Sequence, residues 1–157
     1  MKLFRKSVNN IVKIDAKTLK IQGMYALGSG KGPTGLAYDH MYHLLLSGCR
    51  ESNQLMIADV RSGDLVDSVN IGTRCDGVYF LPDSKEILTS NGEGTITVIQ
   101  QVDPWHYKAV QTLITKHGAR TITYDEKSKR FYLPVAEWDD LKHTYIPNSF
   151  GILVVGK

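Results

Sequence analysis

Residues 10–28 read NIVKIDAKTLKIQGMYALG, and residues 54–72 read QLMIADVRSGDLVDSVNIG. The two segments align without a gap at an offset of 44 residues, and the alignment places Asp15 on Asp59 and ends both segments on glycine. A repeat period of roughly 40 to 50 residues is typical of propellers and solenoids. This repeat therefore decides the fold class, and the rest of the chain is interpreted from it.

A second kind of segment recurs between these two. It reads GLAYDHMYHLLLSG from residue 35, GVYFLPDSKEILTSN from residue 77 and TITYDEKSKRFYLPV from residue 121, so the starts are 42 and then 44 residues apart. Each copy has a β-prone run, a polar turn and a second β-prone run, which is the pattern of a hairpin. Short strands separated by Gly, Asn, Asp and Ser indicate an all-β chain with almost no helix.

The strands group into four units when the strands of a unit are named A to D from the inside outward. We expect residues 1–28 to supply strands B, C and D of an incomplete first blade, and residues 33–72 and 75–114 to form complete blades. Residues 118–157 then supply strands A, B and C of an incomplete last blade. The sequence thus predicts a single partial domain over residues 1–157, a β-propeller fragment of about 3.5 four-stranded antiparallel blades.

The pieces NNIVKIDAKTLKI, LPDSKEILTSNGEGTITVI and YDEKSKRFYLPVA resemble the YVTN-type repeats of bacterial β-propellers of the YncE-like kind. The Tyr-Val-Thr-Asn signature of that family is altered here, for example to Leu-Thr-Ser-Asn at residues 88–91. The closing FGILVVGK resembles the last strand of such propellers, so the chain resembles their C-terminal half. The resemblance implies a seven-bladed ring and a periplasmic or cell-surface location.

Composition excludes several classes of protein. Hydrophobic residues make up 42% and charged residues 22%, which are the values of a globular chain and not of a disordered one. The net charge of +3 is scattered along the chain, so we expect no nucleic-acid partner, which would need a clustered basic face. We expect no membrane insertion, since no apolar stretch of 18 residues occurs, and the N-terminal residues do not read as a secretory signal.

The cysteines and histidines give no metal or catalytic pattern. Cys49 and Cys75 cannot make a disulfide framework and lack the spacing of a zinc site, so we expect two free, partly buried thiols. Activation of the Cys75 thiol by Arg74 is the catalytic alternative. The five histidines share no metal-ligand spacing, and the residues 28–35, GSGKGPTG, lack the order of a phosphate-binding loop. We therefore expect no bound metal and no cofactor.

Ligands of propellers usually bind where loops converge at one end of the central channel. The D-to-A and B-to-C connections carry most of the polar side chains, and Arg74 and Asp76 at the head of an innermost strand could hold a charged ligand or form a surface ion pair. The acidic and aromatic stretch of residues 137–140 opens a long loop, which we expect to be solvated. The candidate ligand-binding residues are Arg50, Glu51, Arg74, Asp76, Asn91, Glu93, His117, Arg120, Glu137 and Trp138, with Lys31 and Cys49 nearby.

Three interpretations of function remain open at this stage. The first is a non-enzymatic binding or scaffold module that uses the loop face. The second is a lactonase-like or quinoprotein-like propeller enzyme with a channel metal or cofactor, and the third is a truncated fragment without independent function. Because an open array leaves two apolar blade faces in water, we expect a homo-oligomer, most simply a dimer, that completes the ring.

The strand pattern also predicts a core. The inward-facing apolar side chains of the recurring strands should be buried, namely Leu36, Leu45, Ile57, Val78, Leu88, Val98, Ile122, Tyr132 and Val154.

Overall fold

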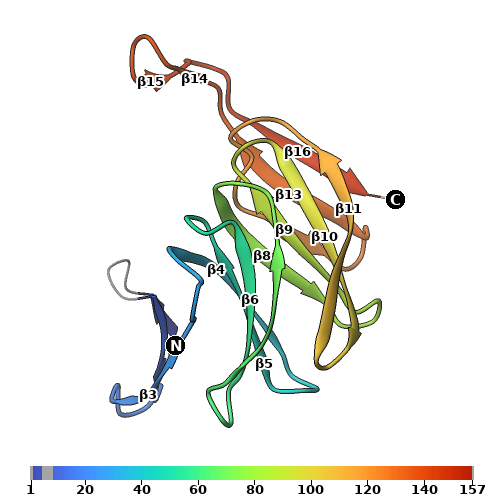
Figure 1. The fold of residues 1–157 in the computed structure, drawn as a ribbon. Coiled ribbons are helices and arrows are strands. Elements are labelled where there is room, and N and C mark those ends of the chain that lie inside the picture. Colours follow the sequence, from blue (N-terminus) through green and yellow to red (C-terminus); the bar gives the residue numbers. More distant parts are fainter. Residues whose placement is uncertain (1, 5–8, 157) are drawn as a thin grey trace.

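The computed structural model describes residues 2–4 and 9–156 of the chain, with side chains from residue 9. All regular structure in these residues is antiparallel β-sheet, so the all-β fold class is confirmed. In the described residues there is no helix long and apolar enough to cross a membrane. The sheets follow one another as the blades of a partial propeller, with the first and last sheets at opposite ends of the array (Figure 1).

The first two sheets come from the N-terminal half of the chain. Blade 1 has the strand order β1-β2-β3 and blade 2 the order β4-β5-β6-β7. The bounds are β1 (Lys2–Phe4), β2 (Asn10–Ile14), β3 (Ile21–Ala26), β4 (Pro33–Asp39), β5 (Leu44–Cys49), β6 (Gln54–Asp59) and β7 (Leu65–Asn70). The sequence also predicts that the first strand continues through residues 5–7, which lie outside the described residues.

The C-terminal half supplies the other two blades. Blade 3 has the order β8-β9-β10-β11, blade 4 the order β12-β13-β16, and a separate hairpin pairs β14 with β15. The bounds are β8 (Cys75–Leu81), β9 (Glu86–Asn91), β10 (Thr95–Asp103), β11 (His106–Ile114), β12 (Thr123–Asp125), β13 (Arg130–Val135), β14 (Trp138–Asp139), β15 (Thr144–Tyr145) and β16 (Gly151–Gly156). The hairpin stands away from the blades in Figure 1, between β13 and β16 in the chain.

One turn geometry recurs at the strand connections. An aspartate carboxylate accepts hydrogen bonds from backbone N–H groups two or three residues later, and the residue four positions after the aspartate has a positive φ. Asp and Asn favour such turns because their short side chains reach the backbone of the turn. The five pairs are Asp15 with Leu19, Asp39 with His43, Asp59 with Gly63, Asp125 with Lys129 and Asp139 with His143.

Neighbouring blades approach closely at two glycines of the innermost strands. A Cβ on Gly35 would lie 2.7 Å from Val78 Cγ2 and 2.9 Å from the Gly77 carbonyl carbon, and a Cβ on Gly77 would lie 2.7 Å from Ser90 Oγ and 3.1 Å from the Ile122 nitrogen. These positions are 42 residues apart, so they are the same position of the repeat. Glycine is required there because β4 and β8 pack backbone against backbone.

Three apolar clusters fill the junctions between consecutive blades. The cluster between blades 1 and 2 contains Ile11, Tyr25 and Met56, and the one between blades 2 and 3 contains Ile57 and Ile99. The cluster between blades 3 and 4 is built from Leu88, Ile96, Val98, Phe131, Leu133 and Val135. Full burial of an aliphatic side chain contributes about 1.5–3 kcal/mol. The junctions are therefore the main stabilising element of the array.

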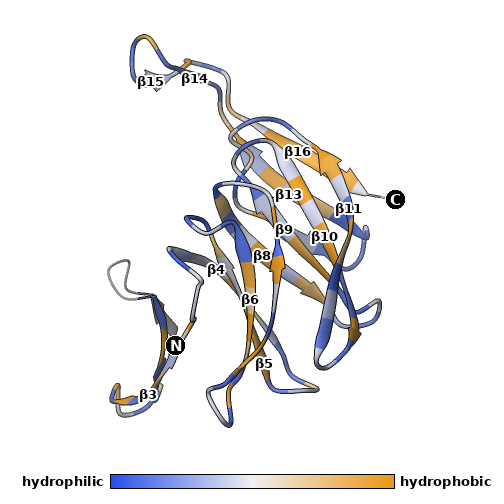
Figure 2. Cartoon of the chain, in the orientation of Figure 1, coloured by the Kyte–Doolittle hydropathy of each residue, from blue (hydrophilic) through white to orange (hydrophobic). Residues whose placement is uncertain are grey.

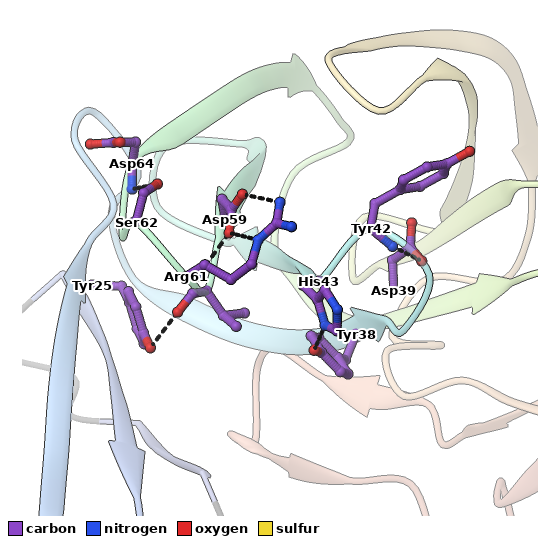
Figure 3. A network of polar contacts seen from close by, with 10 residues as sticks. Tyr25, Tyr38, Asp39, Tyr42, His43, Asp59, Arg61, Ser62 and Asp64 are labelled. Carbon is purple, nitrogen blue, oxygen red and sulfur yellow. Dashed lines mark hydrogen bonds and ion pairs between the residues drawn. The ribbon is translucent and has the colours of Figure 1, made fainter.

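Hydrogen bonds also cross each junction. The Tyr25 hydroxyl of blade 1 donates to the Val60 carbonyl of blade 2 over 2.9 Å, beside a turn in which Arg61 bonds Asp59 (Figure 3). The hydrogen bond from the Arg61 side chain lowers the pKa of the Asp59 carboxyl group to about 2. The Thr34 hydroxyl donates to the Cys75 carbonyl over 2.5 Å at the next junction, and the Ser90 hydroxyl donates to the Arg120 carbonyl at the third.

The buried core agrees in part with the sequence. Leu45, Ile57, Leu88 and Val98 are buried, and the side chains Leu36, Val78, Ile122 and Tyr132 are half-buried. The prediction for Val154 is wrong, because its side chain is 47% exposed. Alternate residues of a strand point to opposite faces. Val154 therefore points away from blade 3, to a side on which the described residues form no further blade.

The glycine requirement gives the first testable prediction. Gly35→Ala forces a methyl group against the backbone of Gly77, and overpacking of this kind costs about 1–3 kcal/mol. The matched control is Gly151→Ala, since a Cβ at this strand glycine meets nothing within 4 Å. Urea denaturation should show a lower free energy of unfolding for Gly35→Ala and a change below about 0.5 kcal/mol for the control. Equal effects of the two variants would contradict the close approach of the blades.

Candidate functional site

A hollow of about 750 Å³ lies at one end of blades 3 and 4. It is bounded by the connections β7–β8 and β11–β12 and by the segment between β13 and β16. These are the same D-to-A and B-to-C connections that the sequence analysis selected. The residues that line the hollow are Arg74, Asp76, His117, Gly118, Arg120, Thr121, Pro134, Val135, Ala136, Trp138, Asp140, Tyr145 and Phe150.

One wall of the hollow is aromatic, and the β14–β15 hairpin supplies most of it. Trp138 and Tyr145 are cross-strand partners, with ring centroids 5.0 Å apart and ring planes at 82°. Phe150, just before β16, is the third aromatic residue of the lining and is 70% exposed. Edge-to-face ring pairs stabilise the arrangement of their strands while leaving ring surface free for a ligand.

The lining also contains two arginines, Arg74 and Arg120. Arg74 has a positive φ of 59°, and its Nη1 lies 3.5 Å from His117 Nε2, a distance at the long end of a hydrogen bond. A guanidinium can only donate, so His117 accepts through Nε2 in this contact. Among the described residues, no carboxylate oxygen lies within ion-pair distance of the Arg74 guanidinium. The positive charge of Arg74 is therefore not neutralised within the site.

Asp76 lies between two other arginines. Arg50 Nη1 is 3.2 Å from Asp76 Oδ1, and Arg120 Nη1 is 3.9 Å from Asp76 Oδ2. The first of these links blade 2 to blade 3, because Arg50 directly follows β5 and Asp76 lies at the start of β8. Asp76 thus compensates the charge of Arg50 and partly that of Arg120. The lining as a whole balances its two arginines with Asp76 and Asp140, but among the described residues Arg74 has no carboxylate within ion-pair distance.

Five of the ten candidate residues line the hollow, namely Arg74, Asp76, His117, Arg120 and Trp138, and Arg50 adjoins them through Asp76. The other four lie elsewhere. Glu51 packs beside Gly32, Glu93 accepts hydrogen bonds from Thr73 and Thr95, and Glu137 pairs with Lys116 at 2.6 Å. Asn91 is fully buried and bonds Thr89, Thr95 and Thr97. Its side chain stabilises the β9–β10 connection rather than a ligand.

The β14–β15 hairpin differs from the solvated loop expected after residue 137, and Tyr145, Phe150 and Asp140 are lining residues that were not among the candidates. A signal was present, because Asp139-Asp140-Leu141-Lys142-His143 has the same Asp-to-His spacing as Asp39-His40-Met41-Tyr42-His43, and both form the aspartate turn described above. The similarity was hidden because the hairpin strands are only two residues long.

The two thiols lie beneath this face and take no part in the hollow. Cys49 and Cys75 are free and fully buried. Burial raises the pKa of Cys49 to about 11, and burial together with the nearby Asp76 raises the pKa of Cys75 to about 12. Arg74 therefore does not activate the Cys75 thiol, which contradicts the catalytic alternative for this residue.

Two further features of the described residues bear on the site. No group of three or more His, Cys, Asp or Glu side chains in them is placed to hold a metal ion. A second hollow of about 760 Å³ is lined by residues of blades 3 and 4 near the β8–β9 turn, among them Tyr79, Leu113 and Phe131. Its rim carries Asp83, Glu86 and Glu126 against Lys129, so it is more acidic than the loop-end hollow.

Comparison with known proteins supports the fold and leaves the family open. No protein-family model matches the chain, and no curated protein matches it. Among solved structures, a chain of hydrazine synthase from Kuenenia stuttgartiensis superposes with a TM-score of 0.76 and 16% identity, over 99% of this chain and 46% of that chain. A chain of the mitotic checkpoint complex gives a TM-score of 0.69 and 13% identity, over 90% of this chain and 42% of that one.

A functionally unknown protein from Desulfotomaculum acetoxidans gives a TM-score of 0.65 and 14% identity, over 98% of this chain and 56% of that one. These neighbours have propeller-like folds, so the chain is a partial β-propeller. The chain spans about half the length of the structures that it resembles.

The thiol environments give a second testable prediction. At pH 8 a thiol with a pKa of about 11 is only about one part in a thousand thiolate, and the thiolate is the reactive form. Ellman's reagent should therefore titrate both cysteines at least about 100-fold more slowly in native protein than in urea-unfolded protein. The unfolded sample is the internal control, and rapid reaction of either thiol in the native protein would contradict the burial of these residues.

Proposed function

We propose that this chain is a non-enzymatic binding module whose loop-end hollow holds a small ligand with an anionic group on a flat apolar body. The observation that carries the proposal is Arg74, an arginine without a carboxylate partner among the described residues, which lines the same hollow as three aromatic side chains. A hollow of about 750 Å³ is within the size range of small-molecule sites.

The lack of an ion-pair partner for Arg74 among the described residues favours an anion beside this residue. Asp76 already bonds Arg50 and lies near Arg120, so it does not offset Arg74. Guanidinium groups bind carboxylates and phosphates through paired N–H donors, and such charge-assisted bonds are stronger than neutral ones. Asp140, which also lines the hollow, disfavours a second anionic group and so favours a ligand with a single anionic group.

The aromatic wall favours a flat apolar body on that ligand. Trp138 and Tyr145 are 44% and 58% exposed although they pack on each other, so much of their ring surface is open to a ligand. Stacking of a ligand ring on these side chains would bury apolar area and orient the anionic group towards Arg74. The hollow therefore combines a guanidinium group with exposed aromatic ring surface, and these features suit a ligand-binding site.

The proposal extends to family and location. The resemblance of the repeats to those of YVTN-type propellers supports membership of that family and a periplasmic or cell-surface location.

The test uses phenyl phosphate as the probe, since it combines a phosphate with an aromatic ring. The chain has two tryptophans, so a Trp105→Phe background leaves Trp138 as the only fluorescent indole. Saturable quenching by phenyl phosphate is expected, with weaker responses to phosphate alone and to phenol alone. Arg74→Gln in the same background should weaken binding about 10- to 100-fold, because it removes a charge-assisted hydrogen bond of about 1.5–3 kcal/mol.

The matched control is Arg61→Gln, which removes an arginine that bonds Asp59 in the β6–β7 turn and does not line the hollow. It should bind phenyl phosphate as the parent does. Unsaturable quenching, or equal affinity of the Arg74→Gln variant and the parent, would contradict the proposal.

A further inference from the structure

Blade 4 presents an apolar face on which no other blade formed by the described residues lies. This C-terminal face consists of two cross-strand pairs, Tyr132 with Val154 and Pro134 with Ile152. Ile152 and Val154 are 51% and 47% exposed. Figure 2 colours much of β16 as hydrophobic, at the end of the array that bears the C-terminus.

The pairing register shows which face of blade 3 corresponds to the C-terminal face of blade 4. In blade 3, Val98 pairs with Leu88 and Ile96 pairs with Ser90, as Val154 pairs with Tyr132 and Ile152 with Pro134 in blade 4. Ile96 and Val98 are 0% and 7% exposed, because blade 4 covers them. The C-terminal face is therefore the structural counterpart of a face that packs against a following blade.

Blade 1 carries the complementary kind of face. Its N-terminal face consists of the pairs Val12 with Met24 and Ile14 with Ile21, in which Met24 and Ile21 are 64% and 66% exposed. At the repeat offset of 44 residues, Val12 corresponds to Met56, which blade 2 buries against blade 1. The N-terminal face is thus the counterpart of a face that packs against a preceding blade.

The inner edges of the two faces also fit each other. Gly35 and Gly77 admit the innermost strand of the following blade, but the corresponding residue of blade 4 is Thr121, whose side chain would hinder such a strand. Among the described residues, the sheet of blade 1 contains β1, β2 and β3 and no strand inside β1. Blade 1 can therefore stack on blade 4 without bringing a strand against Thr121.

From these faces we infer that blade 1 of a second copy stacks on blade 4 of the first, head to tail, and that two copies close into a ring. The contact continues the series of blade junctions within the chain, because it joins one face of each kind. Closure by two copies agrees in length with hydrazine synthase, of whose chain this chain matches 46%. A head-to-tail contact closes into a ring when its rotation permits. This inference is independent of the ligand-binding proposal, which concerns the loop ends.

The test is the mass of the protein in solution by light scattering during gel filtration at micromolar concentration. The parent should have twice the mass of the 17.6-kDa chain. Val154→Asp and Met24→Asp each place a charge on an exposed position of one face, so each should raise the dissociation constant at least 100-fold without loss of folding. Met41→Asp is the control, since Met41 is 73% exposed in the β4–β5 turn, outside both faces, and should remain dimeric.

A mixture of the two face variants distinguishes head-to-tail contact from contact between like faces. The Met24→Asp copy keeps its C-terminal face and the Val154→Asp copy keeps its N-terminal face, so an equimolar mixture should form heterodimers although each variant alone is monomeric. A monomeric parent, a dimer that survives both substitutions, or a dimer lost in only one variant overturns the proposal. A larger assembly that both substitutions dissolve overturns the two-copy ring.

Discussion

The close approach of consecutive blades along their innermost strands is the constraint on which the rest of this structure depends. Gly35, Gly48 and Gly77 leave no room for a side chain where one blade meets the next, and the backbone of β4 lies against that of β8 as a result. With the inner strands held at this separation, the alternate residues of each strand fill one junction on each side, and the three apolar clusters follow. Because the clusters lie between sheets rather than within them, the array is stabilised by its junctions.

The close approach of the blades also determines where the charged residues of the loop-end hollow lie. Stacked inner strands bring the connections β7–β8 and β11–β12 to one end of the array, and this puts Arg74 near His117 and Asp76 between Arg50 and Arg120. The β14–β15 hairpin is an insertion between β13 and β16, so it can extend from that end without disturbing a junction. Charge comes from the regular connections of the repeat and aromatic surface comes from the insertion, and the hollow between them combines both.

Most of the fold could be predicted from the sequence because the same local pattern occurs in each repeat and predicts the same structure each time. The aspartate turns at Asp15 and Asp59 are an example. The burial and role of a side chain were harder to predict where they depend on residues that are distant in the sequence but close in the fold. The sequence of β16 predicts a core strand, yet Val154 is exposed because no blade formed by the described residues covers that face of blade 4. Asn91 was a candidate by its position in a connection, but neighbouring threonines bury and satisfy its side chain. The hairpin at residues 138–145 could not be distinguished from a solvated loop, because each of its strands is only two residues long.

A double-mutant cycle between blades 2 and 3 tests the central claim most directly. A Cβ on Gly48 would lie 2.6 Å from Cys75 Sγ, so Gly48→Ala overpacks the junction while Cys75→Ala opens a space at the same point. If the blades meet as described, the two changes compensate each other, and the double variant is at least about 1 kcal/mol more stable in urea than the sum of the single effects implies. Additivity within about 0.3–0.5 kcal/mol, the behaviour of distant and independent sites, would contradict the account.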